Sequence, residues 1–294
     1  MKKEIGIIGL GSMGASMATH LKKKYKIYGY DIKKNNKIKS SKNFFFVKNL
    51  KEIFLKTNIF IIIVLDENQC QKILDTFIDL KKRLKINKNY TIINCSTVSA
   101  NWVKKIYKRL KKNNFEYIDC PISGGPKKAL KGQLSLIISS KKNIYYKNLT
   151  LLKDIGENIY NLGNKIGTGS TVKIINNSLA GIQIISAAEA IILAKKEKIN
   201  LKKIFKIINN SSGHSWMFND RGKRMIDKKY FKPLSRLSIF KKDMKLANKL
   251  IKKHYLNLPL NKIALRIYEM GCKQGFENFD DSAVINLLDK KVDY

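Results

Sequence analysis

The sequence predicts an α/β protein in which a doubly wound sheet at the N-terminus is followed by an all-α C-terminal domain. Apolar strands alternate with helical patterns as far as residue 162, which is typical of a doubly wound sheet. Beyond the stretch Gly163–Gly169, which carries three glycines, the strand patterns stop. A chain of 294 residues is long enough for two domains, and we place them at 1–164 and 165–294.

The first strand, turn and helix form the most specific pattern. Lys3–Ile8 is a short apolar strand, Ala15–Lys24 continues as a helix, and Lys26–Tyr30 is a second strand that ends at Asp31. A GxGxxG turn joins the first strand to the helix and consists of Gly9, Leu10, Gly11, Ser12, Met13 and Gly14. In a Rossmann-like unit these glycines permit a tight turn, close approach of a pyrophosphate, and packing of the helix on the strand. We therefore expect a dinucleotide site here rather than a glycine turn that binds nothing.

The acid at the end of the second strand predicts which dinucleotide binds. Asp31 would accept hydrogen bonds from the ribose hydroxyls of the adenosine and would repel a 2′-phosphate. The expected cofactor is therefore NAD rather than NADP. Lys33 and Lys34 could weaken this preference, because cations there could meet a 2′-phosphate.

The other elements follow from the hydrophobic periodicity. In the first domain we expect further strands at Phe44–Val47, Ile59–Leu65, Tyr90–Cys95, Tyr117–Cys120, Leu134–Ser139 and Asn158–Leu162. Helices are expected between them at Leu50–Lys56, Gln69–Leu84, Ala100–Lys112 and Tyr145–Ile155. The second domain begins with a long apolar helix at about 170–196, of the kind usually buried between domains. Further helices are expected at Leu201–Asn209, Met244–Lys253, Asn261–Gly271 and Ser282–Leu288.

The composition excludes several classes of protein. The net charge is +37, but only six of the 59 basic residues are Arg, and Lys, Asn and Ile have codons rich in A and T. We therefore expect a solvated lysine surface and no specific nucleic-acid partner, with polyanion binding as the alternative. The chain has no run of about 18 uncharged apolar residues, so no membrane span is expected. Its four cysteines and three histidines lack metal-ligand spacing, so we expect reduced thiols, no metal site and a cytoplasmic location.

Two clusters in the sequence have residues suited to catalysis. Lys173 and Asn177 lie four residues apart, on one face of the predicted long helix. Lys173 stands among small and apolar residues, where a partly desolvated amine can act as a general acid or base; the simpler interpretation is a surface charge. After the strand that ends near Asp119, a turn of three residues forms either a plain turn or a nest of N–H groups for a carboxylate: Ser123, Gly124 and Gly125.

The segment Gly213–Arg221 is ambiguous. Trp216, Met217, Phe218 and Arg221 could close over a small polar substrate, or they could pack as an ordinary helix turn, and the role of His214 is equally open.

Six motifs, in order, make the chain similar to the β-hydroxyacid dehydrogenase family, which includes 3-hydroxyisobutyrate dehydrogenase. They are the glycine turn, Asp119–Gly125, Gly132–Leu134, Gly169–Asn177, Lys242–Met244 and Asp280–Val284. The resemblance spans nearly the whole chain. Within the family it is greatest to the L-threonate dehydrogenase branch, in the stretches Gly169–Leu193, Gly213–Arg221 and Pro233–Asp243.

The resemblance implies a role for each of these positions. Lys173 would be the catalytic lysine, Asn177 would help to hold the substrate, and Ser123, Gly124 and Gly125 would bind its carboxylate. Four positions would contact or flank the cofactor in addition to the glycine turn and Asp31: Leu65, Asp66, Thr97 and Lys242. Asp66 stands where the family commonly has Pro, and Ala100 replaces another common Pro, so the shape of the first of these loops is open.

The predicted function is NAD-dependent oxidation of a small hydroxy acid that resembles L-threonate. The neutral amine of Lys173 would remove the hydroxyl proton while hydride passes to the nicotinamide, in a cleft between the carboxyl ends of the strands and the long helix. The alternative substrates are 3-hydroxyisobutyrate and tartronate semialdehyde. Alternatives of another class are a cofactor-binding protein without catalysis and a basic nucleic-acid-binding module. The resemblance and the long apolar helix also predict a homodimer or homotetramer.

Overall fold

A computed structural model describes residues 2–33 and 38–289 of the chain. By its internal contacts the chain divides into two compact units, Met1–Lys173 and Ile174–Tyr294, and the division falls inside the helix α7 (Thr168–Lys196). Lys34, one of the two lysines expected near a 2′-phosphate, lies outside the described residues.

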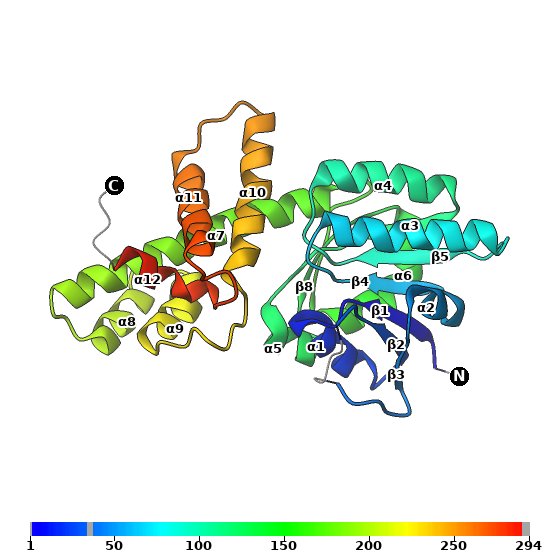
Figure 1. The fold of residues 1–294 in the computed structure, drawn as a ribbon, viewed down its shortest axis with the longest axis horizontal. Helices are drawn as coiled ribbons and strands as arrows, with labels where there is room; N and C mark the ends of the chain where they lie inside the picture. Colours follow the sequence, from blue (N-terminus) through cyan, green and yellow to red (C-terminus); the bar gives the residue numbers. More distant parts are fainter. Residues whose placement is uncertain (1, 34–37, 290–294) are drawn as a thin grey trace. The chain divides into compact units, whose positions relative to one another are not determined.

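The first unit is built on a nine-stranded sheet in the order β3-β2-β1-β4-β5-β6-β8-β7, with β9 beside β8 (Figure 1). The strands are β1 (Glu4–Ile8), β2 (Lys26–Tyr30), β3 (Phe44–Phe46), β4 (Ile59–Ile62), β5 (Tyr90–Asn94), β6 (Phe115–Asp119), β7 (Ile122–Ser123), β8 (Ser135–Ser140) and β9 (Asn158–Asn161). Strands β1 to β6 pair in parallel, and their order reverses between β1 and β4. This is the doubly wound Rossmann order, so the predicted fold class is confirmed.

Helices cover both faces of the sheet, which explains why its strands are apolar without alternation. They are α1 (Ser12–Leu21), α2 (Leu50–Lys56), α3 (Glu67–Arg83), α4 (Ala100–Lys112), α5 (Gly125–Lys131) and α6 (Lys142–Ile155). In β4, Ile59 and Ile61 join the core beneath α1 and α6, whereas Phe60 and Ile62 join the core beneath α2, α3 and α4.

Three features of this unit differ from the expectation. Strand β8 runs antiparallel to β6, and β7 and α5 were not predicted. The apolar run at 134–139 has the same hydrophobic pattern whether the strand is parallel or antiparallel to its neighbour, so the periodicity cannot predict the direction of β8. The two-residue strand and the short glycine-led helix are too short to give a periodic pattern.

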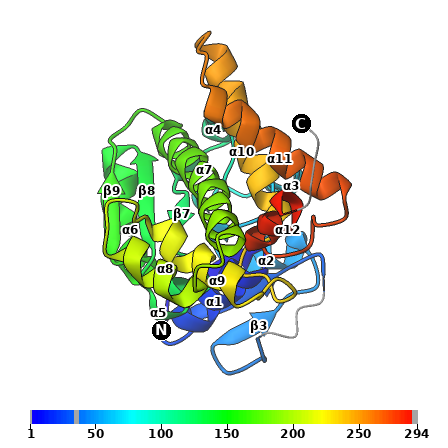
Figure 2. The same cartoon turned by 90° about the vertical axis from the view of Figure 1, so that its left-hand side faces the viewer.

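The second unit is entirely helical in its described residues (Figure 2). After α7 it contains α8 (Leu201–Asn209), a π-helical turn η1 (Phe218–Gly222), α9 (Lys223–Ile226), α10 (Leu237–Lys253), α11 (Pro259–Lys273), a 3₁₀ turn η2 (Asp281–Val284) and α12 (Ile285–Leu288). Its core combines Ile184 of α7, Met244 of α10 and Tyr268 of α11, all fully buried. The turn η1, the helix α9 and the start of α10 at Leu237 were not predicted.

One helix of the described residues, α7, has the length and composition of a membrane span, with a mean hydropathy of 1.5 over its most apolar window. Half of that window is buried inside the protein, as in a helix that packs in the core of its own chain. Length and composition alone are therefore weak evidence for a span.

Candidate active site

The glycine turn after β1 is closed to side chains at two positions and open at a third. Gly9 has a φ of +94°, and a Cβ there would lie 2.2 Å from the carbonyl oxygen of Ile63. A Cβ on Gly14 would lie 1.8 Å from the carbonyl oxygen of Gly9, so the first turn of α1 sits directly on the loop. At Gly11 a Cβ would meet no described heavy atom within 4 Å, which leaves room for a pyrophosphate beside the backbone.

Asp31 is tied to the same turn. Its Oδ2 accepts a hydrogen bond of 2.6 Å from the backbone N–H of Leu10, and its Oδ1 accepts one of 2.8 Å from Lys33. A carboxylate has about four acceptor positions, so hydrogen bonds to ribose hydroxyls remain available. Asp31 therefore also fixes the glycine turn to the end of β2, which the sequence did not reveal.

The loop after β4 shows what replaces the proline common in similar proteins. Asp66 is the N-cap of α3, and its Oδ1 accepts a hydrogen bond of 2.9 Å from the backbone of Gln69. The side chain of Gln69 accepts one of 3.0 Å from the backbone of Leu65. Asp66 has a φ of −150°, which the proline ring would not allow. A reciprocal cap thus holds this loop, and Leu65 stays exposed at its end.

The loop after β5, which carries Thr97, is joined to the loop after β4. Ser96 Oγ accepts a hydrogen bond of 2.9 Å from the backbone of Val64, and Glu67 accepts one of 2.7 Å from the backbone of Ser99. Thr97 therefore lies at the carboxyl end of the sheet, between two anchored neighbours. Ligands of open α/β sheets bind at this edge, beside the point where the strand order reverses.

The turn after β7 needs glycine. Gly124 has a φ of +129° and Gly125 a φ of +75°, both in the region that disfavours other residues. A Cβ on Gly125 would meet no described heavy atom within 4 Å, whereas the stem of Lys128 packs over Gly124. The turn thus presents backbone and the hydroxyl of Ser123, which suits a carboxylate.

The first turn of α7 is held on the sheet by a buried acid. Asp119, at the end of β6, accepts hydrogen bonds from the backbone and hydroxyl of Ser170 and from the hydroxyl of Ser139. Burial raises the pKa of the Asp119 carboxyl, although these hydrogen bonds oppose the rise. Lys173 follows in the next turn of α7 and is 7% exposed.

A second acid joins two of the residues expected at the site. In the helical unit, Asn177 Nδ2 donates a hydrogen bond of 2.7 Å to Asp243 Oδ2. Asp243 Oδ1 lies 2.7 Å from the ammonium of Lys242, as an ion pair without an aligned hydrogen bond. Neither Asp119 nor Asp243 was assigned a role from the sequence, since only the folded chain brings donors to them.

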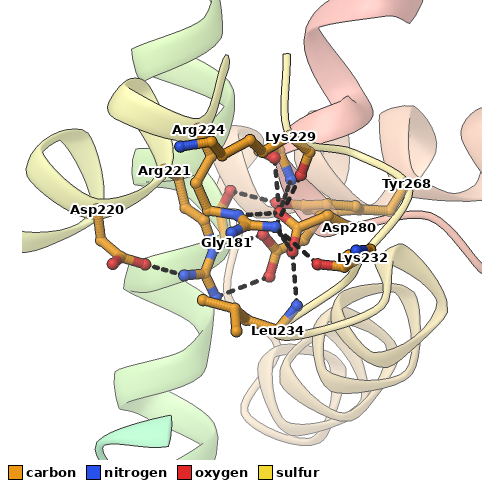
Figure 3. A network of polar contacts seen from close by, with 11 residues as sticks. Gly181, Asp220, Arg221, Arg224, Lys229, Lys232, Leu234, Tyr268 and Asp280 are labelled. Carbon is orange, nitrogen blue, oxygen red and sulfur yellow. Dashed lines mark hydrogen bonds and ion pairs between the residues drawn. The ribbon is translucent and has the colours of Figure 1, made fainter. Parts of the chain in front are cut away.

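Arg221 is buried in the helical unit and is paired with two acids. The residue is 7% exposed, and its guanidinium pairs with Asp281 through two nitrogens. It also pairs with Asp220 (Figure 3). Phe218 is also buried and stacks on Phe205 at 5.6 Å. Packing therefore accounts for these two residues, whereas Trp216 and His214 are exposed.

Three of the four cysteines, Cys70, Cys95 and Cys120, are buried, and Cys272 is partly exposed. Among residues 2–33 and 38–289 no group of three or more His, Cys, Asp or Glu side chains could hold a metal ion.

Comparison with known proteins gives matches over almost the whole chain. The family described as the NAD binding domain of 6-phosphogluconate dehydrogenase matches residues 4–163. The family described as NAD-binding of NADP-dependent 3-hydroxyisobutyrate dehydrogenase matches residues 167–288.

Similar full-length proteins carry related names. The L-threonate dehydrogenase of Haemophilus influenzae is 32% identical over 97% of this chain and 94% of its own, and that of Escherichia coli is 30% identical over the same shares. The crystal structure of a 3-hydroxyisobutyrate dehydrogenase from Salmonella typhimurium is 29% identical, with a TM-score of 0.88 over 97% of this chain and 99% of that one.

Proposed function

The chain belongs to the family of β-hydroxyacid dehydrogenases that includes 3-hydroxyisobutyrate dehydrogenase, and on that premise we propose that it oxidises L-threonate or a similar small hydroxy acid with NAD. As a member of this family it is an NAD(P)-dependent oxidoreductase that acts on CH–OH groups. The observation that carries the proposal is a lysine, Lys173, buried next to a helix turn that is hydrogen-bonded to the carboxyl end of the sheet.

In this proposal the glycine turn and Asp31 hold the dinucleotide, whose nicotinamide supplies a hydride acceptor when bound. The substrate carboxylate binds to the turn formed by Ser123, Gly124 and Gly125. Lys173 Nζ takes the proton of the reacting hydroxyl and returns it in the reverse direction. Asn177 orients the substrate, and its own amide is oriented by Asp243.

Replacement of the lysine tests the mechanism. Lys173→Ala should lower kcat roughly 10²- to 10⁴-fold, the usual contribution of a general acid or base, and should leave the Kd for NAD within twofold. Lys165→Ala, in an exposed position before α7, is the matched control. Turnover of Lys173→Ala near that of the wild type would refute the assigned role.

The cofactor preference rests on Asp31. We expect a higher kcat/KM with NAD than with NADP, because the carboxylate repels a 2′-phosphate. Asp31→Ser should reduce the difference. A clear advantage for NADP in the wild type would overturn this part of the proposal.

A panel of substrates separates the remaining functions. NADH fluorescence should report the highest kcat/KM with L-threonate; preference for 3-hydroxyisobutyrate, or for the reduction of tartronate semialdehyde, would reassign the substrate. NAD binding without turnover of any hydroxy acid would indicate a protein that has lost catalysis. Nucleic-acid binding with sequence preference that survives about 0.2 M salt would favour the basic binding module.

We further propose a homodimer or homotetramer in the cytoplasm. Ile175, Leu179 and Leu193 are exposed, and their spacing places them on one face of α7. Leu179→Lys combined with Leu193→Lys should dissociate the oligomer in light scattering, whereas Ile207→Lys, an equally exposed position on α8, should not. A monomeric wild type would overturn this assignment.

A further inference from the structure

We propose that Asp119 is a positioning residue for Lys173: a buried carboxylate that fixes the first turn of α7, and thereby the lysine, at the carboxyl end of β6. This inference rests on the proposed catalytic role of Lys173. It adds a residue from a different element, 54 positions earlier in the chain, to the machinery of the same reaction.

The contacts converge on one carboxylate. Asp119 has no exposed surface, and its Oδ1 accepts a hydrogen bond of 2.6 Å from Ser170 Oγ. Its Oδ2 accepts one of 3.0 Å from the backbone N–H of Ser170 and one of 2.9 Å from Ser139 Oγ. Ser139 Oγ accepts in turn from the backbone N–H of Gly169 at 3.2 Å. Strands β6 and β8 therefore both hold the start of α7 through this group.

The position of the carboxylate suits a helix N-terminus. The first N–H groups of a helix have no partner within it, and a negative charge beside them interacts favourably with the helix dipole. Most such caps come from the residue just before the helix, but Asp119 belongs to a distant strand. It therefore determines where α7 lies on the sheet in addition to satisfying its end.

The fit of the helix on the sheet is tight. A Cβ on Gly169 would lie 2.5 Å from the carbonyl oxygen of Ile137 and 3.1 Å from that of Asp119. The backbone of α7 thus lies directly against β8 and the end of β6.

Lys173 moves with this turn. Ser170 and Lys173 are three residues apart and therefore neighbours on one face of α7. Loss of a hydrogen bond at Ser170 or Gly169 would shift the turn, and a shift of about 1 Å in a reacting group can cost about 10²-fold in rate.

The test uses Asp119→Asn, Ser139→Ala and Ser170→Ala in the full-length enzyme. Each should lower kcat about tenfold or more, with KM and the Kd for NAD within twofold. The control is Asp154→Asn. Asp154, on α6 of the same unit, accepts hydrogen bonds from Lys24 and Tyr25, and kcat of this variant should stay within twofold. The two serine variants keep the test decisive if Asp119→Asn does not fold.

Amide hydrogen exchange provides the second measurement. In Ser139→Ala, exchange in a peptide that spans 168–173 should accelerate at least tenfold, with peptides of β1 and α1 unchanged. A normal kcat in both serine variants, or a reduced kcat without faster exchange at this turn, would overturn the positioning role. Full turnover of Lys173→Ala would instead overturn the proposed function, so the two failures are distinguishable.

Discussion

The two units of the molecule bury carboxylates in opposite ways. In the first unit, Asp119 accepts hydrogen bonds from neutral donors, which are the hydroxyls of Ser139 and Ser170 and the backbone N–H of Ser170. In the helical unit, Asp280 and Asp281 are equally buried but are paired with guanidinium groups. Neutral donors add one hydrogen bond each, whereas each arginine also compensates a charge, so the loss of a donor should have a different cost in each unit.

The two buried acids of the helical unit, Asp280 and Asp281, also differ in their pKa values. Burial acts to raise the pKa of both acids, but hydrogen bonds from Arg224 and Ser282 bring the pKa of Asp280 below its usual value. For Asp281, burial prevails over Arg221 and raises the pKa to about 6. The pKa values of these two adjacent acids are therefore shifted in opposite directions, although both acids lie at the same arginine cluster.

The largest effect is expected from Arg221→Met. This variant leaves Asp281 buried without its principal cation, so the helical unit should lose about 3–5 kcal/mol of unfolding free energy. Each unit has one of the two tryptophans, so in a Trp102→Phe background urea unfolding followed by Trp216 reports this unit alone. A loss below about 1 kcal/mol would remove the distinction between charged and neutral donors.

The pH response of Asp281 should be smaller. Between pH 4 and 6 the unfolded chain releases the proton while the folded chain keeps it, so this group contributes stability below pH 4 that is lost as pH rises through 6. The loss is about 3 kcal/mol, because the pKa is raised by about two units and each unit corresponds to about 1.4 kcal/mol. The stability of Asp281→Asn should rise with pH more steeply than that of the wild type over this interval. In Asp280→Asn the slope should change in the opposite sense, but below about pH 4, because the folded pKa of Asp280 lies below its usual value. Equal slopes in all three proteins over both intervals would contradict this prediction.

Ser139→Ala tests how much a neutral hydrogen-bond donor to Asp119 contributes to stability. It removes the hydrogen bond that Ser139 donates to a buried carboxylate, which keeps those from Ser170, so we expect the first unit to lose about 1–2 kcal/mol. Unfolding followed by Trp102 in a Trp216→Phe background measures it. A loss as large as that of Arg221→Met would mean that neutral donors and cations are equivalent here.

The smallest effect is expected at the surface. Lys223, which is exposed, forms an ion pair with the partly exposed Asp227 four residues later. Lys223→Ala should change stability by less than about 0.5 kcal/mol, and the change should disappear in 0.5 M salt. A larger change would show that burial does not determine how much an ion pair contributes to stability, because this surface pair would then resemble the buried pair of Arg221 and Asp281.

The sequence predicted most strands and helices of the fold, but it did not predict the direction of β8 or the turn at Phe218–Gly222. β2, α2, α4 and α8 have the predicted bounds, because each has a clear period between turn residues. The antiparallel direction of β8 depends on its partner β6, and the turn at Phe218–Gly222 depends on a salt bridge to residue 281. Interactions between residues far apart in the sequence do not alter the hydrophobic periodicity of either segment, so the periodicity cannot reveal them.

The same limit applies to the candidate site. Its glycines were predictable because the backbone requires them, as the φ of Gly9 and the contact at Gly14 show. The N-cap role of Asp66 was local and could have been inferred from Gln69 three residues later. The roles of Asp119 and Asp243 required the folded chain, since their donors are 20 or more residues away.

The anchored start of α7 also bears on how such proteins can recombine. A chimera joined at 164/165, within the glycine-containing stretch, would take the carboxylate of Asp119 from one parent and its donor Ser170 from the other. A crossover after Lys173 would keep β6, β8 and the first turn of α7 from a single ancestor. Gene fusions between relatives should therefore remain active more often when the junction lies inside the helix than when it lies in the loop before it.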